Sequence, residues 1–378
     1  MPLVLDDDQK MMRDTAEGFF RSKAPIGQLR ELRDSESPDG FSRELWAEMG
    51  GMGFAGVLVP ENHGGVEMGF TTAGLVAEAM GANLSASPFL STSVLAATAL
   101  KAGSDAQREE WLPKVAQAEA ILAFALDEGP KHNPERISTR AAKDGNGFVL
   151  QGEKAMVVDG HVADALVIAA RTSGEDADAD GVSLFLVPRD ASGLEVERTH
   201  MVDSRNAARI RLNDVRVSGD ALLGPLDGGR ETLDKVLAAG RAVIAAELLG
   251  AGQAAFDSTV DYIKSRKQFG TEIGSFQALQ HRASHLYSEM EVARSAVMAA
   301  LSALDEGHDH AHTFAAMAKA KLGQVAKLAG LEGIQMHGGV GMTDEYDIGL
   351  YLKRIRVLQE LLGDANFQAD RLARAKGY

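Results

Sequence analysis

Short runs of apolar and β-branched residues fill the middle of this chain, and long helix-type patterns flank them on both sides. Between about residues 121 and 226 these runs are separated by turn residues, as in ILAFAL, GFVLQG, ALVIAA and VSLFLVP. Runs of this length with turn signals between them are typical of β-strands. The stretch KDGNG, residues 143–147, has the composition of a hairpin turn. The middle of the chain therefore predicts an antiparallel β-domain.

Helical periodicity covers the two flanking segments. In the first, start and stop signals predict a helix after Asp6–Asp8 and further helices over 42–49, 71–80, 92–102 and 105–118. In the second, the pattern predicts helices over 232–265, 276–305, 313–337 and 345–362, followed by a short tail helix. We therefore expect an α+β chain of three parts: a helical domain over 1–120, a β-domain over 121–226 and a helical bundle over 227–378.

The composition excludes several classes of function. The chain of 378 residues has no cysteine, which rules out thiol catalysis, disulfides and cysteine-ligated metals. Its formal net charge of −15 argues against binding to nucleic acid or anionic membranes. The N-terminal stretch lacks the pattern of a signal peptide, and the apolar stretch 242–256 is too short for a membrane span and carries Glu247. We expect a soluble, cytoplasmic protein without a membrane span.

A first motif joins two of the predicted long helices. The stretch SRKQFGTEIGSFQALQH, residues 265–281, places Arg266, Gln268 and Phe269 before a glycine, and Gln277 at the start of the next helix. A guanidinium group suits a pyrophosphate, while amides and an aromatic ring suit an adenine. The alternative interpretation is an ordinary interhelical loop with a surface arginine.

A second motif follows a later helix. The stretch QMHGGVGMTDEY, residues 335–346, begins with Gln335 and has glycines at 338, 339 and 341. Backbone without side chains lets another molecule approach closely, and exposed N–H groups can bind phosphate. A glycine-rich helix end is the alternative, and neither motif is specific by itself.

Taken together, the motifs resemble those of the acyl-CoA dehydrogenase family. Arg266-x-Gln268-Phe269-Gly270, Phe276-Gln277 and Gln335-x-x-Gly338-Gly339-x-Gly341 occur in the order and at the spacing of that family. The resemblance extends over the whole chain, through GGMGFAGVLVPENHGG, GEKAMVVDGHVADALVIAA, LNDVRV and Arg241. The fold of the family, an N-terminal helical domain, a middle β-domain and a C-terminal four-helix bundle, agrees with the expected order.

The resemblance implies a flavoprotein that forms an α,β-double bond in an acyl-CoA thioester. A carboxylate would remove the α-proton while the β-hydrogen leaves as hydride to N5 of FAD, and electrons would pass on to an electron-transfer flavoprotein. Arg241 would lie near the CoA-binding cleft. The pyrophosphate and adenine of FAD would be held, partly for a neighbouring subunit, by Arg266, Gln268, Phe269, Gln277, Gln335, Gly338 and Gly339. We therefore expect at least a dimer.

The sequence departs from the family at both known positions of the catalytic base. Most members carry the base in a Glu-Gly pair near the C-terminus, where this chain has Leu362-Gly363. The second position directly precedes the arginine that matches Arg241, and here it is Gly240. Neither leucine nor glycine can accept a proton.

The strands that face the flavin in the family are also altered. The family stretch Thr-Glu-Pro-Gly-Ala-Gly-Ser is replaced by LDEGPKHNP, residues 126–134. The aromatic and hydroxyl residues that follow the family lysine, Lys154, are Met156 and Val158. Because those hydroxyls hydrogen-bond the flavin ring in the family, flavin binding here would use backbone groups or would be impaired.

Glu247 lies alone among apolar residues in RAVIAAELLGAGQAAF, residues 241–256. It is seven residues from Gly240, which is two helical turns or about 10 Å along one face, so it is expected to face the same cleft one step deeper. Burial disfavours the charged form of a carboxylate, and this suits a base that takes up a weakly acidic proton. The alternative is a structural ion pair, for instance with Arg241 or with a partner chain.

Asp364 is a second candidate for the base, because it lies two positions beyond the usual one. As the residue before ANFQADRLA it is also a typical helix N-cap. The histidines of GHDHAH, residues 307–312, resemble metal ligands, but their alternate spacing fits a loop better, and we expect no metal site.

Functions from different classes therefore remain open. The chain is a FAD-dependent acyl-CoA dehydrogenase with a relocated carboxylate, or a non-catalytic structural subunit that completes the FAD site of a partner acyl-CoA dehydrogenase chain in a hetero-oligomer. A flavin oxidase that acts on a substrate without CoA is a third possibility. The missing bases favour the structural subunit, whereas the two adenine-end motifs fit both of the first two functions.

Overall fold

The computed structural model describes residues 4–378, which fold into two compact units. Unit 1 contains the described residues up to Glu31 together with Phe70–Ala86 and Arg241–Tyr378. Unit 2 contains Leu32–Gly69 and Ser87–Gly240. The three parts expected from the sequence follow one another along the chain, whereas each compact unit takes in part of the N-terminal segment.

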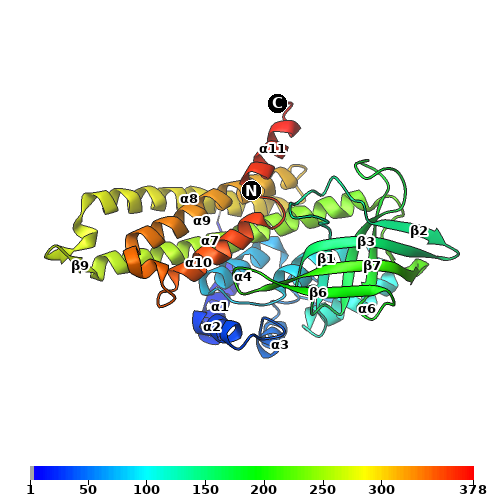
Figure 1. The fold of residues 1–378 in the computed structure, drawn as a ribbon, viewed down its shortest axis with the longest axis horizontal. Coiled ribbons are helices and arrows are strands. Elements are labelled where there is room, and N and C mark those ends of the chain that lie inside the picture. The colour runs from blue at the N-terminus through cyan, green and yellow to red at the C-terminus, as the bar shows by residue number, and fades with distance from the viewer. Residues whose placement is uncertain (1–3) are drawn as a thin grey trace. The chain divides into compact units, whose positions relative to one another are not determined.

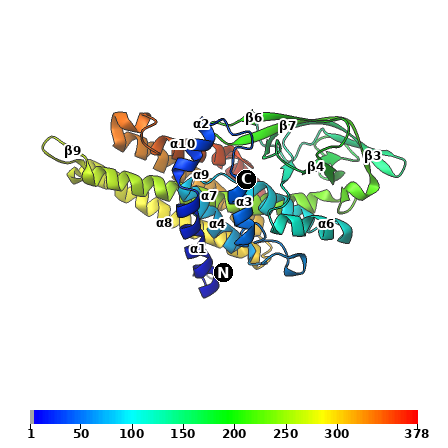
Figure 2. The ribbon, with the colours of Figure 1, turned by 90° about the horizontal axis from the view of Figure 1, so that it is seen from below.

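Long helices build unit 1. In chain order they are α1 (Asp7–Lys23), α2 (Ile26–Asp34), α4 (Gly69–Asn83), α7 (Gly229–Ser265), α8 (Gln277–Asp305), α9 (Ala311–His337), α10 (Ile348–Glu360) and α11 (Ala365–Ala375). α2, α4 and α7 each reach into residues of unit 2. Figures 1 and 2 show α8 and α9 running alongside each other, with the β9 hairpin at the end of α7 where α8 begins. The helices predicted for the C-terminal segment are confirmed, and the pattern over 232–265 is one continuous helix.

Glycines allow α4 and α7 to cross at close range. A Cβ atom added at Gly81 of α4 would collide with the backbone carbonyl of Glu247, and one added at Gly250 of α7 would collide with the carbonyl of Glu78. The apolar side chains of α7 near this crossing, such as Ile244 and Leu248, are fully buried. A side chain at either glycine would therefore push the two helices apart.

By length and composition, α7 could cross a membrane. The sequence-based expectation considered only the apolar stretch 242–256, and the helix as a whole is longer than that stretch. However, 94% of its most apolar window is buried inside the structure. A helix that is apolar all round and packed on all sides is typical of a protein core, so we interpret α7 as the central helix of the bundle.

A mixed sheet forms the centre of unit 2. Its strands are β1 (Leu122–Ala125), β2 (Arg140–Asp144), β3 (Gly147–Val158), β4 (Ala165–Arg171), β5 (Val182–Pro188), β6 (Leu194–His200), β7 (Asn206–Ser218) and β8 (Leu222–Leu223). Their order is β6-β7-β3-β2-β4-β5-β8, with β1 paired to β4. β4 and β5 are buried along almost their whole length, as expected for the continuous apolar runs ALVIAA and VSLFLVP.

Most strand pairs are antiparallel, as predicted, but β4 also has parallel neighbours. β1 pairs with β4 in parallel from Leu122↔Ala165 onward, and β2 meets β4 in parallel at Arg140↔Arg171. The predicted hairpin is confirmed, because Asp144 of β2 pairs with Gly147 of β3 across a two-residue turn. The long segment between β1 and β2, residues 126–139, has no regular structure.

Short helices complete unit 2. They are α3 (Arg43–Gly51), α5 (Ala97–Leu100) and α6 (Asp105–Ala116), and a π-helix, η2 (Phe89–Ala96), precedes α5. The predicted helix over 92–102 is therefore only partly α-helical. Thr92 of η2 gives a reason, because its hydroxyl bonds both the N–H and the carbonyl of Leu122 in β1. The π-helix is thus hydrogen-bonded to β1 of the sheet.

Candidate cofactor and acyl-CoA site

The Arg266 motif forms a hairpin between α7 and α8. Its strands, β9 (Lys267–Gln268) and β10 (Thr271–Glu272), pair in antiparallel register. The two turn residues, Phe269 and Gly270, have φ angles of 55° and 82°, as in a type I′ turn. A bulky residue rarely adopts this left-handed conformation, and the Phe269 side chain is also 93% exposed. The ring is therefore open to another molecule, as are the exposed Arg266, Gln268 and Gln277.

The glycine motif lies at the end of α9. A Cβ atom placed at Gly338 or Gly339 would meet nothing within 4 Å, and both glycines are exposed together with Gln335. The N–H of Gly338 donates to the carbonyl of Gln335, so this N–H closes the helix instead of facing outward. The open backbone surface and the exposed Arg266 guanidinium nevertheless fit the adenine and pyrophosphate of FAD.

Arg241 lies inside unit 1 and is only 2% exposed. Its Nε donates to the carbonyl oxygen of Leu362 at 3.1 Å, and its guanidinium lies 5.9 Å from the centre of the Phe367 ring. The resemblance implies that this arginine lies near the CoA cleft. The structure shows Arg241 supporting the turn at which most members of the family carry the base.

This turn, Leu362–Gly363, is held by buried side chains from α9 and α11 as well. Leu362 and Gly363 have φ angles of 56° and 97°. Nζ of Lys319 donates to the carbonyls of Gln359 and Gly363 at 2.8 and 3.1 Å, and Nε2 of Gln368 donates to those of Leu362 and Gly363 at 2.8 and 3.2 Å. A leucine in the left-handed region is strained by about 1–3 kcal/mol, and these bonds offset the strain.

Lys319 and Gln368 are members of this cluster that the sequence interpretation missed. The Lys319 side chain is fully buried in α9, and burial, with a further contribution from the charge of Arg241, lowers its pKa from 10.5 to about 7. The nearby Glu360 and Asp364 act in the opposite direction. A signal was present, because Lys319 stands in the alanine-rich stretch AAMAKAKLG as Glu247 stands in AAELLG.

Asp364 follows directly on this turn. Its backbone is extended, and its carboxylate accepts a hydrogen bond from the N–H of Phe367 at 2.8 Å. This is the geometry of a helix N-cap. The capping interpretation of Asp364 is therefore confirmed for α11.

Glu247 lies on α7 in a charge pair with Arg354 of α10. Its Oε1 is 2.8 Å from Nε and 2.7 Å from Nη2 of that arginine, and both side chains are 5% exposed. The sequence interpretation suggested Arg241 as an ionic partner, but the structure pairs Glu247 with Arg354, 107 positions further along the chain. Sequence periodicity gave no signal for this partner because the two helices meet only in the folded bundle.

The segment that replaces the family's flavin-facing stretch lies in unit 2 and is ordered by its own carboxylates. Glu128 accepts hydrogen bonds from the N–H groups of Ser138 and Thr139 and from Nζ of the fully buried Lys154 at 2.7 Å. Burial acts to raise the pKa of Glu128, but the charge of Lys154 and the hydrogen bonds together hold it below its usual value. Asp127 binds Nδ1 of His132 at 2.9 Å.

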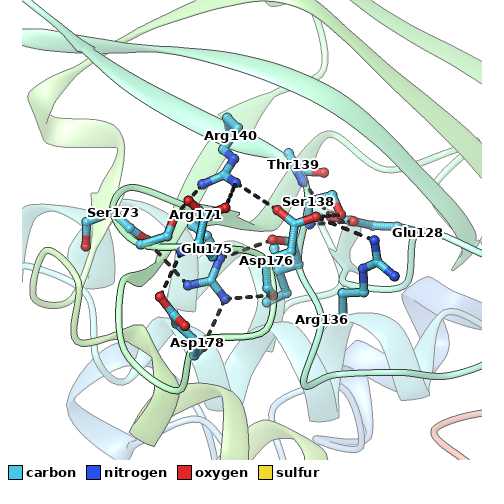
Figure 3. Close-up of polar contacts among 12 residues, drawn as sticks. Glu128, Arg136, Ser138, Thr139, Arg140, Arg171, Ser173, Glu175, Asp176 and Asp178 are labelled. Atoms are coloured by element: carbon cyan, nitrogen blue, oxygen red, sulfur yellow. Dashed lines mark hydrogen bonds and ion pairs between the residues drawn. The ribbon is translucent and has the colours of Figure 1, made fainter.

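The same segment is joined to an acidic loop through a buried arginine (Figure 3). Arg171, at the end of β4, is 1% exposed and donates to the carbonyls of Ile137, Asp176, Asp178 and Asp180. Arg140 adds an ion pair to Asp176 at 2.8 Å. The loop 173–180 is largely exposed, as predicted from its acidic composition, but it is folded around a buried guanidinium.

The fold and the two exposed motifs define a flavoprotein with a helical–β–helical order of domains. Models of the acyl-CoA dehydrogenase N-terminal, middle and C-terminal domains match residues 6–119, 124–215 and 227–377. The chain belongs to the acyl-CoA dehydrogenase family. Members of this family are FAD-dependent oxidoreductases that act on acyl-CoA thioesters.

Individual relatives agree with this assignment. Acyl-CoA dehydrogenase FadE12 of Mycobacterium tuberculosis is 33% identical over 83% of this chain and 82% of its own length. The Tcur3481–Tcur3483 steroid ACAD is similar in structure, with a TM-score of 0.88, 29% identity and 98% of each chain covered. The ChsE4–ChsE5 complex of Mycobacterium tuberculosis gives a TM-score of 0.89 at 26% identity, covering 100% of this chain and 99% of the other.

Proposed function

We propose that this chain is a FAD-binding, non-catalytic subunit of a hetero-oligomeric acyl-CoA dehydrogenase whose partner chain carries the catalytic carboxylate. The observation that carries this proposal is the pairing of Glu247 with Arg354. Nε and Nη2 of Arg354 both contact Oε1 of Glu247 inside the bundle. This oxygen is engaged in joining two helices, and the pairing supports a structural role for Glu247.

The Leu362–Gly363 turn supports the same conclusion. Its carbonyls are held by Arg241, Lys319 and Gln368, so the backbone that presents the base in most of the family is kept in a defined conformation. The side chain at that position is a leucine, which offers no proton acceptor. The turn therefore has a fixed backbone conformation but lacks the carboxylate that would act as the base.

The exposed residues of the Arg266 hairpin and the glycine motif support a part for this chain in binding FAD. When bound, FAD supplies the acceptor for the hydride. Arg266 would neutralise the pyrophosphate, Gln268, Phe269, Gln277 and Gln335 would contact the adenine, and Gly338 and Gly339 would admit the cofactor close to the backbone. The exposure of Phe269 supports sharing this site with a neighbouring subunit, because an aromatic ring that is 93% exposed to water gains by being covered.

Two related structures support a hetero-oligomer. The Tcur3481–Tcur3483 protein and the ChsE4–ChsE5 complex each combine two differently named chains, and this chain is similar to a chain of each over almost its full length. We propose a corresponding arrangement here, with an acyl-CoA substrate, an electron-transfer flavoprotein as electron acceptor and a cytoplasmic location.

The second candidate function is dehydrogenation by this chain itself, with Glu247 as a relocated base. One observation favours it: α7 is continuous from Gly229 to Ser265, so Glu247 lies two turns from Gly240 on the same face of one helix. Asp364 remains a weaker candidate for the same role, since its carboxylate caps α11.

The two functions are separated by purifying this chain alone and together with an acyl-CoA dehydrogenase chain that carries the Glu-Gly pair. The readouts are the oligomeric state by light scattering, the flavin-to-chain ratio and the rate of anaerobic flavin reduction by acyl-CoA in stopped flow. We expect the two chains to form a stable hetero-oligomer whose flavin is reduced by acyl-CoA. This chain alone should show no such flavin reduction. Full-rate flavin reduction by this chain alone would overturn the proposal.

A gain-of-function variant sharpens the test. Leu362→Glu places a carboxylate on the preformed turn, and Leu362→Gln is the matched control that adds the same bulk without a base. If the turn keeps the conformation of the family, Leu362→Glu gains acyl-CoA-dependent flavin reduction in the FAD-loaded protein and Leu362→Gln does not. Equal rates of flavin reduction in the two variants would contradict the proposal that this turn can present a base to the substrate.

A further inference from the structure

We propose that Tyr262 is the positioning residue that holds the two arms of the adenine site together, namely the Arg266 hairpin and the Gly338–Gly339 turn. The inference rests on the proposed assignment of both arms to FAD. Tyr262 lies in the last turn of α7, and no motif singled it out.

On the hairpin side, Tyr262 acts through its backbone. Its carbonyl accepts a hydrogen bond from the N–H of Arg266 at 2.8 Å, and the carbonyl of Arg266 in turn accepts one from the N–H of Ile273 at 2.9 Å. Arg266 therefore leaves the helix in an orientation that the last turn of α7 determines. The β9–β10 hairpin continues directly from this point.

On the glycine side, Tyr262 acts through its side chain. Its hydroxyl donates to the carbonyl of His337 at 3.2 Å, and its ring stacks on the His337 imidazole with centroids 4.3 Å apart and planes at 22°. His337 is 4% exposed, and its Nδ1 bonds the carbonyl of Gly333 at 2.7 Å. The imidazole is thus a fixed platform against which the tyrosine ring packs.

These contacts fix the peptide unit that opens the glycine turn. The His337 carbonyl and the Gly338 N–H belong to one planar group. Tyr262 binds the carbonyl, while the N–H donates to Gln335. Held from both ends, this peptide can point in only one direction, and it determines where the open surface of Gly338 and Gly339 faces.

A third ring completes the cluster. Tyr346 meets the ring of Tyr262 edge-on at 5.7 Å and 87°, and that of His337 at 5.6 Å and 66°. One residue, Tyr262, therefore contacts the start of the hairpin, the start of the glycine turn and the segment that follows it. A ligand that touches both arms depends on this residue without contacting it.

The test compares Tyr262→Phe, which removes only the hydroxyl, with Tyr262→Leu, which also removes the stack. FAD affinity is measured on the flavin-free oligomer, and ADP is titrated as a competitor because it carries only the adenine and pyrophosphate half. We expect both constants to weaken by the same factor, about threefold to tenfold in Tyr262→Phe for one lost hydrogen bond, and further in Tyr262→Leu. The melting temperature of flavin-free Tyr262→Phe should fall by only a few degrees, as expected for one lost hydrogen bond.

Two controls separate this inference from the proposed function. Tyr287→Phe changes an exposed tyrosine of α8 outside both arms and should change neither constant. Arg266→Ala tests the adenine site itself. Weaker FAD and ADP binding in Arg266→Ala with unchanged constants in both Tyr262 variants would overturn the positioning role alone. Unchanged constants in Arg266→Ala, or no competition by ADP in the wild type, would overturn the adenine site and the inference with it.

Discussion

Oε1 of Glu247 accepts a hydrogen bond from Nε of Arg354 at 2.8 Å and forms an ion pair with Nη2 of the same arginine at 2.7 Å, and it thereby joins α7 to α10 inside the helical bundle. Both side chains are almost completely buried. Removing one partner of such a pair leaves an uncompensated charge in the interior, which costs about 3–5 kcal/mol, whereas replacing both partners by apolar residues can be neutral.

The pair can therefore be tested by a double-mutant cycle. We expect Glu247→Met and Arg354→Met each to lower the free energy of unfolding by several kcal/mol, about 3–5 by the rule for broken buried pairs. The double variant Glu247→Met with Arg354→Met should recover most of this loss. The measurement is urea unfolding of the three variants. Stability close to the wild type in both single variants, with flavin reduction lost in Glu247→Met, would instead assign Glu247 to catalysis.

The two possible roles of Asp364, capping α11 and accepting a proton, can be separated by the choice of substitution. Asparagine caps a helix about as well as aspartate, whereas alanine does not. Asp364→Ala should cost about 1 kcal/mol of stability and Asp364→Asn much less. Flavin reduction by the assembled oligomer should be the same in both. A large loss of flavin reduction in Asp364→Asn would show that the carboxylate takes part in the chemistry.

Arg266 is predicted to neutralise the FAD pyrophosphate. Hydrogen bonds to charged groups contribute about 1.5–3 kcal/mol, so Arg266→Ala should weaken FAD binding at least about tenfold. The side chain is exposed, and the helical content by circular dichroism should not change. Retention of FAD after gel filtration and titration of the flavin-free protein provide the measurement. Wild-type affinity in the variant would remove Arg266 from the site.

Lys319 predicts a dependence of stability on pH. Its pKa in the folded protein is about 7, well below the ordinary value of 10.5. Between these values the unfolded chain binds the proton and the folded chain does not, so the lysine makes stability rise with pH. Relative to Lys319→Met, the wild type should gain up to about 1.4 kcal/mol per pH unit as the pH increases from 7 toward 10. A difference between the two proteins that is independent of pH would contradict this pKa.

Much of the architecture could be predicted, because each helix of the bundle carries its own periodicity and boundary signals. α8 and α9 begin within two residues of the predicted positions. The solitary charge in an apolar helix also identified Glu247 as significant. Its partner could not be found in the same way, since Arg354 stands in a mixed stretch, KRIRVLQE, where one arginine looks like another. Only packing decides which of them points inward.

The features that sequence reasoning missed depend on long-range contacts. The parallel pairing of β1 with β4 joins two strands that are separated in the chain by β2 and β3, and no local pattern encodes it. Lys319 met the criterion that singled out Glu247, but a lysine in an alanine-rich helix is usually interpreted as a surface residue. The division of the chain into domains at 120 and 226 stays a prediction.

The buried Arg171 has a consequence for anyone who wishes to modify this protein. The loop 173–180 is acidic, exposed and free of regular structure, so it looks like a suitable place for a tag, a cleavage site or a shortened connection. However, three of its carbonyls form a socket for the guanidinium. Lengthening or trimming the loop would open this socket and leave a permanent cation in the interior of the β-domain. Insertions are better tolerated at the turn over residues 145–146, where both residues are exposed.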